Sequence, residues 1–323
     1  MDLAPAHQPH PPAPKVVNGL SVDVEDWFQV GAFETTIERG DWDGCELRVE
    51  RNVETILALF ERAGVKATFF TLGWVAERVP QAIRAVVDAG HELASHGYDH
   101  QRVFTFAPSE FAEDLRRSRG ILEDIGGCKV TGYRAPSFSI DARTPWAHEE
   151  LAGQGYAYSS SVAPIAHDHY GWRDAPRFAF RPVAGAAMIE LPVTTAMLGK
   201  RRLAAGGGGF FRTLPYGFSR WAIAQVNRDD ARPAVFYFHP WEVDPGHIFS
   251  THGLVNGAGL CVDAFSEPGD AVVMFTPIYH AFFRVIHGGG RKVTELPMVR
   301  NGARYELDFD AYDGMMTGKE KIL

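Results

Sequence analysis

Two histidines four residues apart, His96 and His100, have the type and spacing to hold a metal ion. In one turn of helix or a helix-like loop, residues i and i+4 point the same way, so both imidazoles could reach one cation. The pair follows an apolar stretch, residues 82–89, and Gly90, which we expect to form and end a helix. Because two histidines also fall at this spacing by chance, a metal site needs further support.

Three acids within four positions give that support. Asp23, Glu25 and Asp26 end a short apolar segment that starts at Gly19 and is rich in the residue types of a strand. Alternation along a strand places Asp23 and Glu25 on one side, with Asp26 at the exit. A solvated acidic turn is the alternative. Two imidazoles and one carboxylate, however, would leave a coordination position open for water, as in catalytic metal sites.

The composition narrows the function classes. A formal net charge of −8 over 323 residues argues against a nucleic-acid partner. Three widely spaced cysteines indicate neither a disulfide framework nor a cysteine-type zinc site. No apolar run approaches the ~20 residues of a membrane span. Residues 1–15 are rich in proline and histidine without the apolar core of a secretory signal, so we expect a disordered tail and a cytoplasmic protein.

Short apolar strands alternating with helices are the elements that must position these side chains. This pattern predicts a parallel sheet within an α/β fold. The expected strands are 65–72, 92–95, 130–134, 156–161 and 234–239, and the expected helices are 50–63, 76–89, 110–125, 146–153 and 214–227. Within 76–89, Pro80 suits a helix start or break. Residues 201–209, basic and then glycine-rich, lack the ending of a phosphate loop and are interpreted as a flexible turn. Asp23, His96, Arg134 and His239 all fall at strand ends, where active sites of such barrels gather.

The stretches around these acids and histidines, 19–28 and 92–100, resemble the first two motifs of the polysaccharide deacetylases, the NodB-type carbohydrate esterases of family 4. The segment Ser-Val-Asp-Val-Glu-Asp-Trp-Phe is most similar to the branch of the family associated with exosortase and exopolysaccharide loci. Three more stretches resemble the family's Arg-x-Pro motif, its tyrosine-serine segment and its late histidine strand: 132–137, 158–161 and 236–242. The resemblance implies a distorted NodB-type (β/α) barrel over residues 16–246.

The resemblance implies metal-dependent hydrolysis of N-acetyl groups from an amino-sugar polysaccharide or exopolysaccharide precursor. His96 and His100 would hold a divalent cation, with zinc the most compatible ion, and Asp23 would be the general base. The family commonly has two adjacent aspartates, base and then ligand, but here a valine follows Asp23. Either Glu25 or Asp26 is therefore expected as the third ligand.

The remaining expected site residues assist the reaction or contact the substrate. Arg134 would pair with Asp23 and keep it ionised, and His239 would protonate the departing amine. Pro136, Tyr170 and Trp172 are the expected substrate contacts, the two aromatic rings as an apolar wall for the acetyl methyl group. Residues 167–170 form a second histidine cluster, which we interpret as a rim of the cleft rather than as a second metal site.

The chain changes character near Gly246. Residues 251–259 and 267–280 resemble a piece of a fold-type I pyridoxal-phosphate enzyme of the aminotransferase and cystathionine-lyase group. In that group a glycine-rich helix start holds the cofactor phosphate, and a tyrosine like Tyr279 packs beside the cofactor ring. No pyridine-binding aspartate or Schiff-base lysine follows, so we expect this segment not to bind pyridoxal phosphate.

The sequence thus predicts three parts: the tail 1–15, a deacetylase domain 16–246, and an incomplete α/β segment 247–323. The last part is interpreted as a fused aminotransferase-like fragment, with a divergent native tail as the alternative. The expected partner is an N-acetylated polysaccharide. The alternative functions are a related amidohydrolase acting on small cyclic amide or ureido substrates, and an inactive fused chain.

Overall fold

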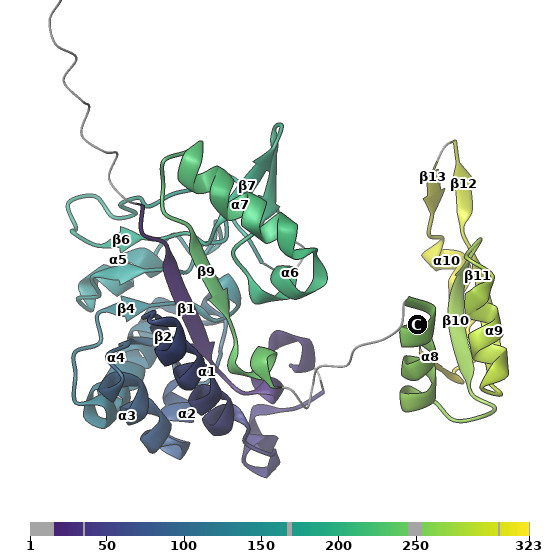
Figure 1. Cartoon of the computed structure of the whole chain (residues 1–323), viewed down its shortest axis with the longest axis horizontal. Helices are drawn as coiled ribbons and strands as arrows, with labels where there is room; N and C mark the ends of the chain where they lie inside the picture. Colours follow the sequence, from purple (N-terminus) through teal and green to yellow (C-terminus); the bar gives the residue numbers. More distant parts are fainter. Residues whose placement is uncertain (1–15, 35, 167–169, 245–253, 303, 323) are drawn as a thin grey trace, which may run out of the picture. The chain divides into compact units, whose positions relative to one another are not determined.

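The chain divides into two compact units, one ending at residue 247 and one beginning at residue 248 (Figure 1). The computed structural model describes residues 16–34, 36–166, 170–244, 254–302 and 304–322. Each unit has hydrophobic clusters of its own, the largest of them in the first unit.

A curled, seven-stranded parallel sheet organises the first unit, in the order β6-β5-β4-β3-β2-β1-β9. Every neighbouring pair in it is parallel. The strands are β1 (Gly19–Val24), β2 (Thr68–Thr71), β3 (Glu92–Ser95), β4 (Gly132–Tyr133), β5 (Tyr158–Ser159), β6 (Ile189–Glu190) and β9 (Val235–Phe238). The expected α/β fold with a distorted barrel is confirmed.

Irregular segments bridge the interval between the edge strands β6 and β9. The backbone N–H of Val193 donates to the carbonyl of Val162 at 3.1 Å, and the next N–H, of Thr194, donates to the carbonyl of Val235 at 3.2 Å. On β9, the N–H of Tyr237 donates to the carbonyl of Gly206 at 2.7 Å. These bonds satisfy backbone groups that an open sheet edge would leave unpaired.

Helices cover the outside of the sheet (Figure 1). In α1, Val53, Ile56 and Phe60 are buried, which is the spacing of one helical face, and the helix ends at Gly64 with φ +62°. The helices of the first unit are α1 (Val49–Ala63), α2 (Gly73–Arg78), α3 (Pro80–Asp88), α4 (Pro108–Gly126), α5 (Ala147–Gly153), α6 (Gly208–Thr213) and α7 (Tyr216–Arg228).

The structure decides two local expectations. The helical stretch expected over 76–89 divides at Pro80, as that residue allows, because proline lacks an N–H and starts α3 instead of continuing α2. The flexible turn expected over 201–209 is wrong: β8 (Arg201–Ala204) pairs antiparallel with β7 (Thr195–Leu198), and residues 206–208, all glycine, are buried. A Cβ at Gly206 would lie 2.6 Å from the carbonyl oxygen of Val235, so glycine is needed there for close packing.

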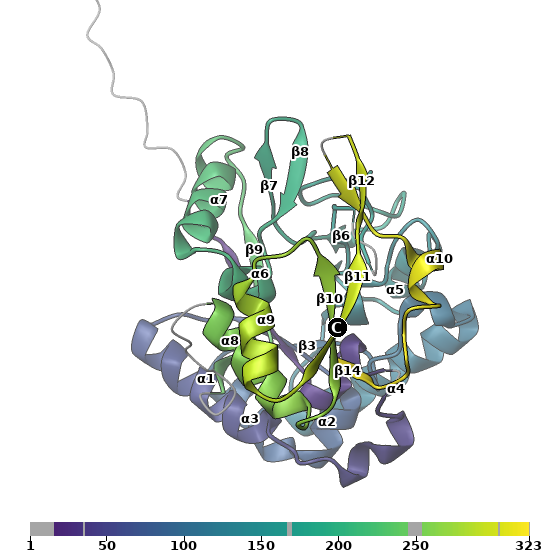
Figure 2. The same ribbon diagram turned by 90° about the vertical axis from the view of Figure 1, so that its right-hand side faces the viewer.

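The second unit is a small α/β structure (Figure 2). Its three-stranded parallel sheet has the order β11-β10-β14, and α8 and α9 pack against each other beside it. The elements are α8 (Leu254–Phe265), β10 (Ala271–Thr276), α9 (Ala281–Gly288), β11 (Lys292–Pro297), β12 (Val299–Asn301), β13 (Arg304–Glu306), α10 (Phe309–Tyr312) and β14 (Glu320–Ile322). In the described parts of both units, no helix has the length and apolar character to cross a membrane.

Candidate metal and catalytic centre

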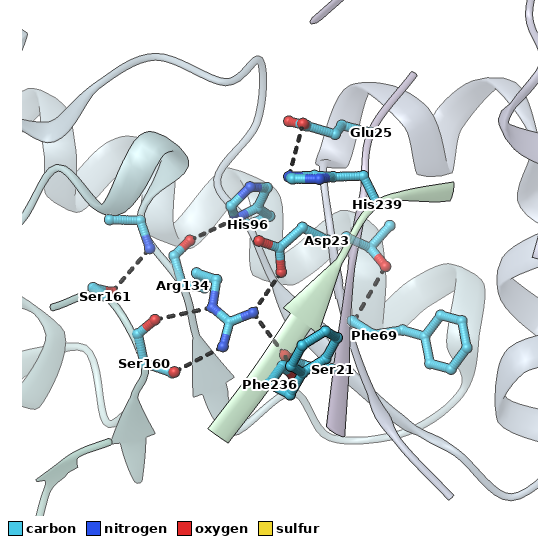
Figure 3. Close-up of polar contacts among 12 residues, drawn as sticks. Ser21, Asp23, Glu25, Phe69, His96, Arg134, Ser160, Ser161, Phe236 and His239 are labelled. Carbon is cyan, nitrogen blue, oxygen red and sulfur yellow. Dashed lines mark hydrogen bonds and ion pairs between the residues drawn. The ribbon is translucent and has the colours of Figure 1, made fainter. Parts of the chain in front are cut away.

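The carboxyl ends of the parallel strands bring the expected polar side chains together (Figure 3). Asp23 lies near the end of β1, with Glu25 just beyond it. His96, Arg134 and His239 directly follow β3, β4 and β9. Parallel strands place their carboxyl ends at one edge of a sheet, so residues distant in the sequence meet there.

Glu25, His96 and His100 form a buried group whose ligand atoms all lie within 4.8 Å of one another. His96 Nδ1 lies 2.8 Å from the carbonyl oxygen of Arg134. Since a carbonyl can only accept, Nδ1 carries the proton and the Nε2 lone pair is left for a ligand. A second hydrogen bond of this kind is how proteins orient metal-binding histidines.

One oxygen of the buried Glu25 carboxylate lacks a hydrogen-bond donor. Its Oε2 lies 2.8 Å from His100 Nε2, but the contact lacks hydrogen-bond alignment, and no described residue donates to this oxygen. Burial raises the pKa of Glu25, yet the histidines around it, His100 foremost, outweigh burial and lower the pKa to about 2. An ionised, under-satisfied carboxylate beside two imidazoles fits a bound cation.

A loop, and not the helical turn that we considered, sets the geometry of the histidine pair. Gly97 and His100 both adopt left-handed backbone conformations, with φ +76° and +60°. The two imidazole centroids are 5.6 Å apart. Burial is the main cause that lowers the pKa of His96 to about 4, so this ring is neutral at physiological pH and able to act as a ligand.

The Asp26 carboxylate binds backbone N–H groups instead of facing the histidines. Its Oδ1 accepts from the N–H of Trp27 at 2.8 Å. Its Oδ2 accepts from the N–H groups of Arg48 at 2.7 Å and Val49 at 2.9 Å, at the start of α1. Of the two acids that the sequence leaves open as third ligand, only Glu25 lies among the histidines.

Arg134 and Asp23 form a buried pair. The guanidinium Nη1 donates to Asp23 Oδ1 at 2.6 Å and to Ser21 Oγ at 2.7 Å. Its Nε and Nη2 donate to the carbonyl and hydroxyl oxygens of Ser160 at 2.9 and 2.8 Å, and its face lies 4.1 Å from the Phe70 ring centroid. The arginine is therefore held on three sides and holds the carboxylate of Asp23 in one place.

Trp241 and Glu242 hold the His239 ring in place. Its Nδ1 lies 2.7 Å from Glu242 Oε1, and its ring stacks on Trp241 at 4.8 Å. Its Nε2 lies 3.4 Å from Glu25 Oε1. Burial lowers the pKa of His239, but the hydrogen bond to Glu242 and the nearby carboxylates outweigh burial and raise the pKa to about 9. The protonated ring can therefore donate a proton from Nε2.

These groups open into a cleft of about 330 Å³. It is lined by Asp23, Glu25, Val30, Gly31, His96, His100, Arg102, Ser137, Phe138, Tyr170, Tyr237, His239 and Trp241. Tyr170 lies in the wall as expected, whereas Pro136 is buried outside the lining and Trp172 packs against the main core. Residues 167–169 of the second histidine cluster lie outside the described residues.

Several residues of the centre were not singled out from the sequence. Ser160 lies in the tyrosine-serine segment and Glu242 three residues after His239, so motif position was an available signal for both. Ser21, Arg102, Phe138 and Tyr237 had no signal beyond strand alternation or chain proximity, because their roles depend on contacts between distant segments.

Two family models match parts of the first unit. Residues 36–156 match the family model described as polysaccharide deacetylase, and residues 160–253 match a domain of unknown function (DUF3473). His96, His100 and Arg134 fall in the first match and His239 in the second, whereas Asp23 and Glu25 precede both.

Individual proteins match parts of the chain. A peptidoglycan deacetylase of Helicobacter pylori is 30% identical over 151 residues, which are 46% of this chain and 49% of that protein. Cystathionine beta-lyase PatB of Bacillus subtilis is 35% identical over 72 residues, 22% of this chain and 19% of that protein. The chain thus spans about half the length of the first relative and about a fifth of the second.

A crystal structure from Mycobacterium smegmatis described as a polysaccharide deacetylase aligns with a TM-score of 0.50 and 22% identity, covering 74% of this chain and 82% of that one. It supports the fold. The resemblance to polysaccharide deacetylases is confirmed by these matches, and the resemblance to pyridoxal-phosphate enzymes rests on one partial match.

Proposed function

We propose, from the premise that this chain contains a polysaccharide deacetylase domain, that it hydrolyses N-acetyl groups of an amino-sugar polysaccharide. The observation that carries the proposal is that Glu25, His96 and His100 line one cleft together with Asp23, whose carboxylate is paired with the buried Arg134. A metal-ligand group, a held carboxylate and a protonated histidine are the parts that amide hydrolysis needs.

Glu25, His96 and His100 would hold a divalent cation, for which we propose zinc because two imidazoles and one carboxylate suit it. When bound, such an ion supplies Lewis acidity and lowers the pKa of a coordinated water. The residues present fit that role. Glu25 is ionised and one of its oxygens has no hydrogen-bond donor, and His96 is neutral, with Nδ1 bonded to a carbonyl and Nε2 left for a ligand. Three protein ligands leave room for water and substrate.

Asp23 acts as the general base. As the water oxygen forms its bond to the acetamide carbonyl carbon, one water proton passes to the Asp23 carboxylate. Arg134 holds that carboxylate in place through a hydrogen bond to Oδ1, and its own bonds to Ser21 and Ser160 fix the position of the guanidinium. Arg134 is thus a positioning residue that acts through Asp23.

His239 acts as the general acid. When the bond between the carbonyl carbon and nitrogen breaks, the amine takes a proton from His239 Nε2, and acetate is left with the oxygen of water. Glu242 orients the ring through Nδ1 and favours the charged form that the step requires. Tyr170, Phe138 and Tyr237 give the cleft an apolar wall for the acetyl methyl group.

The first test measures metal content and acetate release together. We expect about one zinc per chain, and release of acetate from N-acetylated oligosaccharides without turnover of cyclic ureides. A His96→Ala/His100→Ala variant should lose both the metal and the release of acetate. A His280→Ala/His287→Ala variant, which removes two exposed histidines of the second unit, is the matched control. Full acetate release by the His96→Ala/His100→Ala variant would refute the proposal.

A further inference from the structure

One wall of the cleft carries a positive charge for which the proposed reaction has no use. Arg102 is the only arginine or lysine among the described residues that line the cleft. Arg134 is fully buried behind the base and directs its donors to Asp23, Ser21 and Ser160. Arg102, with a side chain 24% exposed, stays within reach of a ligand.

The backbone and a glycine hold Arg102 in this position. Its carbonyl accepts from the N–H and the hydroxyl of Thr105, at 2.9 and 2.7 Å, and the next N–H, of Val103, donates to the buried hydroxyl of Ser139 at 2.9 Å. The guanidinium lies against Gly31, where a Cβ would be 2.9 Å from Nη2. A side chain at position 31 would therefore push the guanidinium away from its place at the cleft.

Arg102 has a carboxylate partner that a ligand can replace. Its Nη2 lies 2.8 Å from Glu34 Oε2, and the Glu34 side chain is 41% exposed. Glu34 also lies 3.8 Å from Arg39, so it retains a cation when Arg102 turns to another acid. Exposed pairs of this kind contribute little to stability, at most about 1 kcal/mol. A guanidinium can instead bind an incoming carboxylate through two parallel hydrogen bonds.

We propose that Arg102 is a specificity residue that selects N-acetylated glycans carrying a carboxylate near the reacting acetamide. The proposal rests on the proposed function and names its substrate class. A chain of net charge −8 repels an anionic polymer at long range, so a local cation in the cleft is what such a substrate needs. The carboxylate could belong to a uronic acid or to the lactyl group of an amino sugar, and the two sources share this chemistry.

Binding to the zinc-loaded full chain tests the proposal without requiring turnover. Calorimetry would compare three tetrasaccharides: neutral chitotetraose, alternating N-acetylglucosamine and glucuronic acid, and alternating N-acetylglucosamine and N-acetylmuramic acid. We expect at least one acidic tetramer to bind roughly tenfold more tightly than the neutral one, and which one does so identifies the source. Equal binding of all three, or no binding of any, overturns the proposal.

Three variants assign the preference to one side chain. Arg102→Gln should remove the advantage of the acidic tetramer and leave binding of the neutral one within about threefold. Glu34→Gln should strengthen acidic binding because it removes the competing carboxylate. Arg39→Gln is the matched control, since it removes a cation from the same acid but lies outside the lining of the cleft. An acidic preference that survives Arg102→Gln, or falls equally in Arg39→Gln, would overturn the assignment.

Acetate release from the same three sugars separates this proposal from the proposed function. Release from all of them with no acidic preference supports the deacetylase and refutes the role of Arg102. Acidic binding that depends on Arg102, without acetate from any tetramer, supports the role of Arg102 and counts against the deacetylase.

Discussion

Amide substitutions at the two neighbouring acids should separate metal binding from stability. Glu25→Gln and Asp26→Asn each remove one negative charge with almost no change of shape. Glu25 lies among His96 and His100, and Asp26 accepts from the N–H of Trp27 and from two N–H groups at the start of α1. We therefore expect Glu25→Gln to remove most of the response to zinc and Asp26→Asn to lower stability with the response intact.

The structure gives the size of both effects. An asparagine at position 26 can still accept from Arg48 and Val49 with its one oxygen, but it loses the bond from Trp27 and the charge at the helix start. Hydrogen bonds to charged groups contribute about 1.5–3 kcal/mol, so the metal-free variant should lose roughly 2–3 kcal/mol. Replacing a directly bound carboxylate at position 25 should weaken zinc binding on the order of 100-fold or more.

Urea unfolding with chelator and with added zinc measures both effects in one experiment. Zinc at about 100 times its Kd should stabilise the wild type by about 2.7 kcal/mol. The Asp26→Asn variant should start from a lower free energy of unfolding and show the same gain. The Glu25→Gln variant, folded by circular dichroism, should gain at most about 0.4 kcal/mol at the same zinc concentration. The reasoning fails if zinc stabilises Glu25→Gln as much as the wild type while a folded Asp26→Asn variant does not respond.

Three other predictions concern packing, pH and the second unit. A Cβ at Gly208 would lie 2.2 Å from Glu242 Oε2, so Gly208→Ala should displace that carboxylate. We expect kcat for acetate release to fall at least about tenfold and the free energy of unfolding to fall by about 1–3 kcal/mol. The control Gly209→Ala, with open space around it, should change neither quantity. Burial is the main cause that raises the pKa of Asp114 to about 7, and the charge of nearby Asp99 adds to it. The contribution of this group to the free energy of unfolding is therefore fully present below its unfolded pKa near 3.8 and is lost as pH rises through 7. Asp114→Asn keeps an acceptor for the N–H of Tyr98 and should stabilise the chain more at pH 8 than at pH 5, by up to about 4 kcal/mol at pH 8, and an equal effect at both pH values in urea unfolding would contradict this. Pyridoxal phosphate added to the full chain should give no stoichiometric imine absorbance, and its appearance would show that the second unit holds the cofactor.

The sequence alone carried the family, the fold class and the side chains that meet at the centre. Asp23 lies near the carboxyl end of β1 and Glu25 directly beyond it, and His96, Arg134 and His239 follow apolar runs that are typical of strands. Once the strands are parallel, their carboxyl ends must lie at one edge. These steps need no knowledge of distant contacts, which is why they could be predicted.

Only the tertiary structure decided which partners each polar side chain of the centre contacts. Glu25 and Asp26 are both acids at the end of one strand, and no local pattern separates them. Asp26 is occupied because the start of α1, 22 residues further along the chain, brings two N–H groups to its carboxylate. Glu25 has an oxygen without a donor and lies instead against histidines that follow β3 and β9. A hydrogen bond depends on distance and direction within a few tenths of an ångström, and only the packing of distant segments sets these.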